Sequence, residues 1–421
     1  MTGHSRTLSV EARDGKIDTF KAAQPVGVGI RTLQSGGMGF SYSSSFDETD
    51  LLRMVDSACT GAQLQTPDQF NLLPAASIYQ EMPALFDKNL GAVSVAAKVE
   101  LALELERLTM AADSRIKRVR KASYGESVYS VHLRNSFDLY GGYAGSSVSS
   151  SVAAIAENEG DSQLGWDFGF SAGFEAIDIA AIASSAAKMA VSQLGAKKIA
   201  GMNCPVVIDS RVAADFLGLL APSFSAENLF KGKSLLQGKS GEQLFPLSIT
   251  IRDDATLRGG MATAPFDGEG VASQDTLLVE AGVINGFLYD TAYAARMGVV
   301  STGNSARSGV KGLPHLGSSN FFIENGTASP LSLRADIVRG LLITSVIGMH
   351  TANPVSGDFS VGASGFLIEQ GEITFPVKGL AISGNIINLF KNVEKVGDDL
   401  RFFSTVAAPS LRINSLDVSG D

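Results

Sequence analysis

The chain has 421 residues, of which 45% are hydrophobic and 18% are charged, and its formal net charge is −9. This composition is that of a soluble globular protein, and the length favours two domains over a single core. An acidic chain without a dense Lys/Arg stretch argues against direct nucleic-acid binding. The sequence shows no apolar stretch of ~20 residues and no apolar leader, so we expect a cytoplasmic protein and not a membrane protein.

The first half of the chain predicts strands and helices in mixed order. Alternating side chains on both sides of Asp14-Gly15 predict a hairpin, because this dipeptide favours a turn with positive φ. Apolar residues at helical spacing predict two helices, and Ser94 is a good cap for the second. The predicted elements are strands at 8–13, 16–20, 26–32 and 39–43, helices at 47–62 and 94–112, strands between 117 and 174, and a helix rich in small residues at 174–194.

The second half predicts one helix at 211–220 and then mainly strands. Asn285-Gly286 and Gln370-Gly371 each separate two apolar runs, which predicts a hairpin turn at both places. We therefore expect an α+β protein. Residues 1–200 form an N-terminal α/β domain with mixed strands and helices, and residues 201–421 form a mainly β domain with a curved or barrel-like sheet.

Nucleotide and metal sites find little support in the sequence. The glycine-rich stretches at 27–29 and 36–39 lie between strands, whereas a dinucleotide-binding loop opens a helix. The phosphate-loop-like segments at 231–234 and 238–240 lack the required upstream glycine. Zinc peptidases need closely spaced imidazoles, and two isolated cysteines suit a reducing compartment. The histidines and cysteines are too far apart for such a site: His4, His132, His315, His350, Cys59 and Cys204.

One loop is a candidate for substrate binding. Small residues precede a predicted strand at 363–368, and a strand edge can accept an extended peptide through main-chain hydrogen bonds. We expect a β-branched residue at Gly357 to impair peptide binding more than stability, because close backbone approach is wanted there. An ordinary glycine turn and a structural histidine remain open as alternatives. The candidate substrate-binding residues are Ser356, Gly357, Asp358, Phe359, Ser360 and His350.

Seven segments together resemble one known family. Each is modest alone, but their order and spacing agree with the TldD/PmbA family, and specifically with its PmbA (TldE) branch. The resemblance covers essentially the whole chain and is densest after residue 205. The segments are PFDGEGV at 265–271, GFLYDTAYAAR at 286–296, TGNSAR at 302–307, NPVSGDFS at 353–360, GFLIEQGEI at 365–373, PVKGL at 376–380 and APSLRI at 408–413.

The resemblance implies an N-terminal α/β domain, a β-rich C-terminal domain, and a pairing with a TldD-like zinc metallopeptidase that acts on unfolded peptides. The zinc helix of the TldD branch would correspond to residues 211–221, which contain neither His nor Glu. The cysteine ligand of that branch has no counterpart at 405–410. We therefore predict no catalytic residue and no metal ligand in this chain, and zinc only in a TldD-like partner.

Three functional hypotheses follow. The favoured one is a non-catalytic PmbA/TldE-like subunit, a pseudo-enzyme that holds an extended peptide for a TldD-like zinc subunit or pairs with itself as a homodimer. The alternative is a non-enzymatic homodimeric peptide binder or modulator of DNA gyrase. A third, an independent Ser or Asp hydrolase, has His350 as its best candidate general base.

Overall fold

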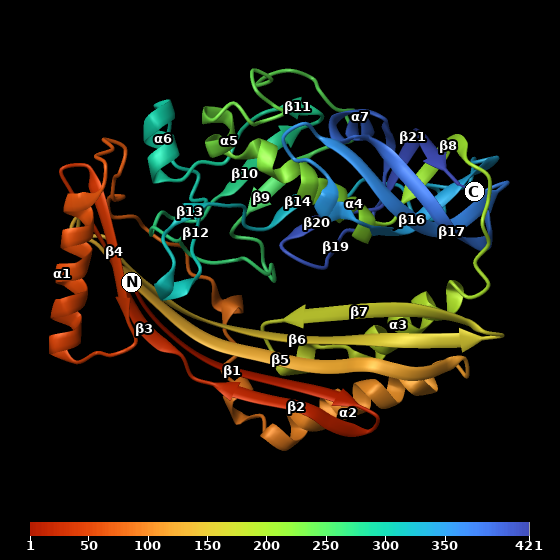
Figure 1. Cartoon of the computed structure of the whole chain (residues 1–421), viewed down its shortest axis with the longest axis horizontal. Helices are drawn as coiled ribbons and strands as arrows, with labels where there is room; N and C mark the ends of the chain where they lie inside the picture. The colour runs from red at the N-terminus through yellow and green to blue at the C-terminus, as the bar shows by residue number, and fades with distance from the viewer. Residues whose placement is uncertain (421) are drawn as a thin grey trace.

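A long antiparallel sheet with helices forms the N-terminal half of the molecule (Figure 1). The structure is a computed structural model that describes residues 1–420. The strands of this half are β1 (Thr2–Arg13), β2 (Lys16–Ala23), β3 (Val26–Gln34), β4 (Gly37–Ser43), β5 (Ile116–Arg134), β6 (Tyr140–Asn158) and β7 (Asp161–Ser171). The helices are α1 (Glu48–Leu64), α2 (Val95–Ala111) and α3 (Ile179–Ser192), with short 3₁₀ turns at Pro83–Leu85, Leu90–Ala92 and Phe174–Ala176.

The predicted hairpin turn and helix cap of this half form as the sequence indicates. Asp14 and Gly15 adopt φ values of 55° and 68°, and they close the β1–β2 hairpin. The Ser94 hydroxyl accepts a hydrogen bond from the Ala97 N–H at 3.2 Å and so caps α2. The last helix begins only at Ile179, where the Asp178 carboxylate caps it.

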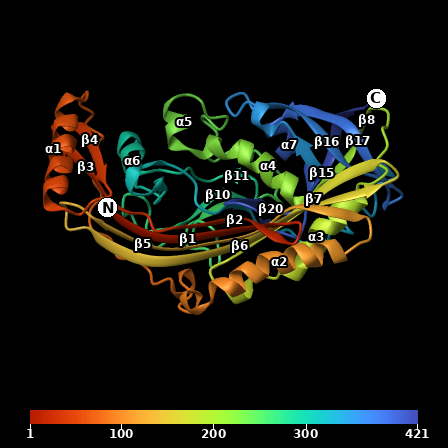
Figure 2. The same cartoon turned by 60° about the horizontal axis from the view of Figure 1, so that its bottom comes forward.

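The sheet follows the order β4-β3-β1-β5-β6-β7. Strand β2 pairs with the second half of β1, from Thr7 to Arg13. Helices α2 and α3 lie together beneath β1, β5, β6 and β7, while α1 covers β3 and β4 at the other end (Figures 1 and 2). A core of aliphatic residues and alanines joins the sheet to α2 and α3, with Tyr124 fully buried at its centre. The opposite face of the sheet is therefore free to meet the C-terminal half.

The C-terminal half contains a closed barrel and a second sheet. The barrel runs β17-β16-β15-β8-β21 and closes through a β17–β21 pairing, with β18 added at its edge. The second sheet runs β11-β10-β9-β14-β20-β19. Barrel strands are β8 (Met202–Ile208), β15 (Arg339–Ile347), β16 (Asp358–Glu369), β17 (Glu372–Asn385), β18 (Val393–Val396) and β21 (Leu411–Ser419). The others are β9 (Ile251–Asp254), β10 (Asp275–Glu280), β11 (Val283–Ile284), β12 (Ser305–Ala306), β13 (His315–Leu316), β14 (Phe321–Ile323), β19 (Arg401–Phe402) and β20 (Val406–Ala408).

The helices of this half are short: α4 (Ser210–Leu220), α5 (Ala226–Phe230), α6 (Thr291–Met297) and α7 (Ile386–Lys391). Three 3₁₀ turns accompany them within the described residues, at Ala221–Phe224, Gly309–Lys311 and Met349–Thr351. A single large core runs through the barrel, α4 and the second sheet, and all its members follow residue 203. The expected α+β fold class, with a barrel-like C-terminal half, is confirmed.

One predicted turn is wrong. The β10–β11 hairpin turns at Ala281-Gly282, whose φ values are 44° and 81°, and not at Asn285-Gly286. Asn285 and Gly286 instead donate their backbone N–H groups to the Leu278 carbonyl beyond the end of the hairpin. By contrast, Gln370-Gly371 closes the β16–β17 hairpin as predicted, with φ values of 51° and 78°.

The two halves contact each other along the open face of the N-terminal sheet (Figure 2). Arg31 pairs with Glu269 at 2.8 Å near one end, and Asp167 pairs with Arg401 at 2.9 Å near the other. Within residues 1–420, no helix combines the length and the apolar character needed to cross a membrane.

Candidate functional site

A cleft of about 770 Å³ lies above α4, between β7 and α3 on one side and the barrel on the other. The Asp209 carboxylate accepts the Arg211 N–H at 3.0 Å and begins α4 directly after β8. Helix α4 packs against β20, so the two segments that the family resemblance links to zinc binding lie side by side. Among the lining residues are Gln163, Leu164, Trp166, Arg211, Asp215, Gly362, Ala363, Ser364, Lys378, Phe403 and Ser404.

The Arg211 guanidinium forms one wall of the cleft. It lies between the rings of Trp166 and Phe403, with its carbon at 4.2 and 4.4 Å from the two ring centroids. The buried Asp167 carboxylate lies 3.4 Å from Arg211 and also binds Arg401. Burial lowers the pKa of Arg211, and its Nε has no hydrogen-bond partner. This arrangement fixes Arg211 as a structural cation at the junction of the two halves.

Asp215 lies one helical turn beyond Arg211 and lines the same cleft. Asp215 is exposed in the cleft, and its carboxylate forms no hydrogen bond or ion pair with any residue between 1 and 420. Partial desolvation raises its pKa, and the charge of Arg211 opposes this shift. A guanidinium clamped between two aromatic rings cannot ligate a cation, so this face of α4 does not fit the zinc site of the TldD branch. In the described part of the chain, no three His, Cys, Asp or Glu side chains are close enough to hold a metal ion.

Strand β7 brings an open sheet edge to the cleft. Within the described residues, β7 pairs only with β6. Arg211 donates to the Trp166 carbonyl at 3.2 Å, and Arg401 donates to the Phe168 carbonyl at 2.7 Å. Since alternate residues of a strand direct their backbone groups to the same side, Ser162 and Leu164 also face outward. The two arginines thus cover one part of the edge and leave the part beside the cleft open.

The predicted substrate loop lies elsewhere. None of its residues lines the α4 cleft, and His350 is exposed in a short 3₁₀ turn. Phe359 is buried and packs edge-on against Phe216 of α4, with ring centroids 4.9 Å apart. Ser356, Asp358 and Ser360 are exposed, and Asp358 accepts a hydrogen bond from the Asn385 amide. The loop therefore supports α4 from its core side.

The open strand edge expected after this loop is absent from the described structure. Strand β16 lies between β15 and β17 over residues 362–369, so both of its edges are already paired there. The start of this strand still reaches the cleft, because Gly362, Ala363 and Ser364 contribute to its wall. A docking role for the candidate loop itself stays a prediction.

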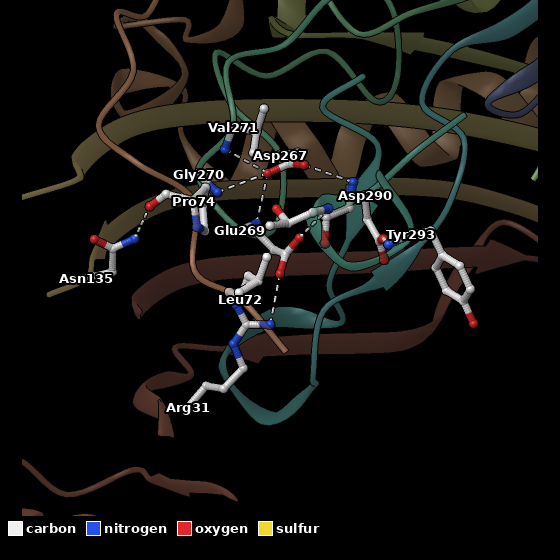
Figure 3. Close-up of polar contacts among 12 residues, drawn as sticks. Arg31, Leu72, Pro74, Asn135, Asp267, Glu269, Gly270, Val271, Asp290 and Tyr293 are labelled. Carbon is white, nitrogen blue, oxygen red and sulfur yellow. Dashed lines mark hydrogen bonds and ion pairs between the residues drawn. The ribbon is translucent and has the colours of Figure 1, made fainter. Parts of the chain in front are cut away.

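A second polar cluster joins the halves around Asp267 (Figure 3). One Asp267 oxygen accepts the N–H groups of Glu269, Gly270 and Val271 at 2.9 Å, and the other accepts the Ser305 N–H at 3.0 Å. Burial and the neighbouring Glu269 raise the pKa of Asp267 to about 7. The cluster ties the PFDGEGV and TGNSAR segments together, and it lies apart from the α4 cleft.

Sequence reasoning missed the residues that define the cleft. Trp166 is the only tryptophan of the chain, and a single large aromatic residue in a strand was the available signal. Arg211 begins the helix that the family resemblance singles out, but its stacking partners come from distant segments. Asp215 gave no signal, because a lone carboxylate on a helix is normally solvated.

The fold and cleft define a class: a two-part α+β protein with an extended sheet, a closed barrel and an interdomain cleft above a helix. Three family models match in chain order. They describe PmbA/TldA metallopeptidase domain 1 at residues 3–62, the central domain at 88–194 and the C-terminal domain at 201–420. The chain therefore belongs to the PmbA/TldD metallopeptidase family, on the PmbA/TldE side.

Individual relatives agree over the whole chain. A metalloprotease PmbA homolog of Haemophilus influenzae is 28% identical and aligns with 98% of this chain and 90% of its own length. Metalloprotease PmbA of Escherichia coli O157:H7 is 26% identical with the same coverage. The crystal structure of a proposed modulator of a DNA gyrase from Thermotoga maritima superposes with a TM-score of 0.91 at 28% identity, covering 99% and 95% of the two chains. TldE from Thermococcus kodakarensis shares the fold, with a TM-score of 0.92 at 24% identity over 100% and 96%.

Proposed function

We propose that this chain is the non-catalytic, peptide-holding subunit of a zinc metallopeptidase assembly, and that a TldD-like partner supplies the zinc and the hydrolysis. The observation that supports the proposal is the chemistry of α4. A cleft lies above the helix, and Arg211 and Asp215 line it from the segment that the family resemblance aligns with the zinc helix of the TldD branch.

The cleft suits an extended peptide better than a compact metabolite. Its walls combine apolar side chains, such as Leu164 and Trp166, with the outward backbone groups of β7. Main-chain hydrogen bonds to an open edge bind unfolded segments with little dependence on their side chains. A subunit of this kind would position substrate while its partner performs the reaction.

The test is reconstitution with the TldD-like zinc protein of the same cell. The chain alone should give no chelator-sensitive hydrolysis of unfolded casein, whereas the mixture should co-elute in size-exclusion chromatography and hydrolyse casein. Asp56→Asn, on the exposed surface of α1, is a matched control that should behave as the unaltered chain does. Chelator-sensitive hydrolysis by the chain alone, or a partner that hydrolyses casein equally well without forming a complex, would refute the proposal.

A further inference from the structure

The open part of the β7 edge carries different charged groups at its two ends. At the end near Trp166 lie Asp215 and the paired Arg211; at the other end the Lys378 ammonium lies 3.8 Å from Asp161. The outward-facing Leu164 is two positions before Trp166, a spacing of about 7 Å along the strand. A peptide paired with Ser162 and Leu164 would therefore place one of its termini beside α4.

Most charged side chains at the α4 end of the cleft already have partners. Arg211 and Arg401 both bind the buried Asp167, and Arg211 is further enclosed by two aromatic rings. Asp209 is committed to capping α4, and burial raises its pKa. Asp215 is the carboxylate that lines the cleft without a hydrogen-bond or ion-pair partner among the described residues. Asp215 is exposed to the cleft, and the nearby Arg211 opposes the desolvation-driven rise of its pKa without forming a hydrogen bond or an ion pair with it. An exposed carboxylate at the end of an open strand edge can receive an ammonium group through a charge-assisted hydrogen bond.

The geometry points to a terminus-specific site: the α4 cleft binds the free N-terminal end of a peptide that pairs antiparallel with β7, and Asp215 receives the peptide's ammonium group. Antiparallel pairing directs the N-terminus of the added strand toward Trp166 and its C-terminus toward Asp161 and Lys378. The opposite direction would bring a carboxylate to Asp215 and an ammonium to Lys378. This inference rests on the proposed peptide-holding function and assigns it a substrate class, peptides with unblocked N-termini.

The experiment compares two forms of a short alanine peptide that carries fluorescein on a C-terminal lysine side chain. One form has a free N-terminus and the other is N-acetylated, and fluorescence anisotropy gives the dissociation constant of each with the full chain. The free form should bind about two- to fivefold more tightly, the discrimination expected of a charge pair at a solvent-exposed carboxylate. Asp215→Asn should remove the preference without weakening the acetylated form.

Two control variants separate Asp215 from general electrostatic effects. Asp56→Asn makes the same chemical change on α1, and Lys378→Gln removes a charge at the far end of the cleft; both should keep the N-terminal preference. Equal binding of the two peptide forms would overturn the inference and leave peptide holding intact. A preference that persists in Asp215→Asn would overturn the role of Asp215, and failure of both forms to bind would overturn peptide holding as well.

Discussion

Replacement of Gly357 by valine distinguishes a docking glycine from a structural one. Gly357 has φ = +79°, a conformation that costs a side-chain-bearing residue about 1–2 kcal/mol. A Cβ there would lie 3.0 Å from both Ile386 Cγ2 and Leu235 Cδ1, and the displacement of these side chains adds about 1–2 kcal/mol. We therefore expect Gly357→Val to destabilise the protein by about 3 kcal/mol, contrary to the sequence-based expectation that binding suffers more than stability.

Thermal and urea unfolding measure this cost directly. A loss of about 3 kcal/mol corresponds to a melting temperature lower by roughly 6–12 °C for a unit of about 200 residues. Gly362→Ala, within β16 and five positions after Gly357, is the control. Its Cβ would meet its nearest neighbour only at 3.8 Å, so the substitution should change stability by less than about 1 kcal/mol. An unchanged melting temperature together with lost peptide binding would refute this reasoning and restore the docking role.

Two further substitutions test the charged groups between the halves. Asp167→Ala leaves two guanidinium groups without their shared buried carboxylate, so we expect the free energy of unfolding in urea to fall by about 2–3 kcal/mol. The control Asp18→Ala breaks an exposed ion pair and should lower it by less than about 1 kcal/mol. Equal decreases for the two variants would contradict the account. Asp267 has a folded pKa of about 7 and an ordinary value of 3.8, so its stabilising effect is fully present below pH 4 and is lost as the pH rises through 7. Between pH 4 and 7 the free energy of unfolding should fall by at most about 4 kcal/mol through this group. Asp267→Asn should be less stable overall, but its free energy of unfolding should change less with pH. Parallel pH profiles for the two proteins would disprove the assignment.

Turns and helix caps could be predicted from the sequence because they depend only on residues that are neighbours along the chain. Asp14-Gly15 and Gln370-Gly371 adopt the positive φ values that tight hairpins need, and Ser94 caps its helix through a neighbouring N–H. The turn at Ala281-Gly282 escaped notice because alanine rarely adopts positive φ, and Asn285-Gly286 carried the stronger turn signal.

The cleft could not be predicted in the same way, because its parts meet only in the folded molecule. Trp166, Arg211 and Phe403 come from three distant segments, and their contact depends on how the N-terminal sheet meets the barrel. The candidate strand after Gly357 looked like an edge because sequence does not reveal which strands acquire two neighbours. The family resemblance directed attention to α4, but it did not identify the side chains that line the cleft above this helix.

Zinc content is the most direct test of the central claim that this chain holds substrate and leaves metal chemistry to a partner. The chain should be purified alone, without a metal-affinity tag, dialysed, and assayed for zinc by elemental analysis. The account predicts zinc well below one equivalent per chain, because Arg211 and Asp215 do not make a zinc site on α4. Close to one equivalent that survives dialysis would contradict it, and the protein would then have to be treated as a peptidase in its own right.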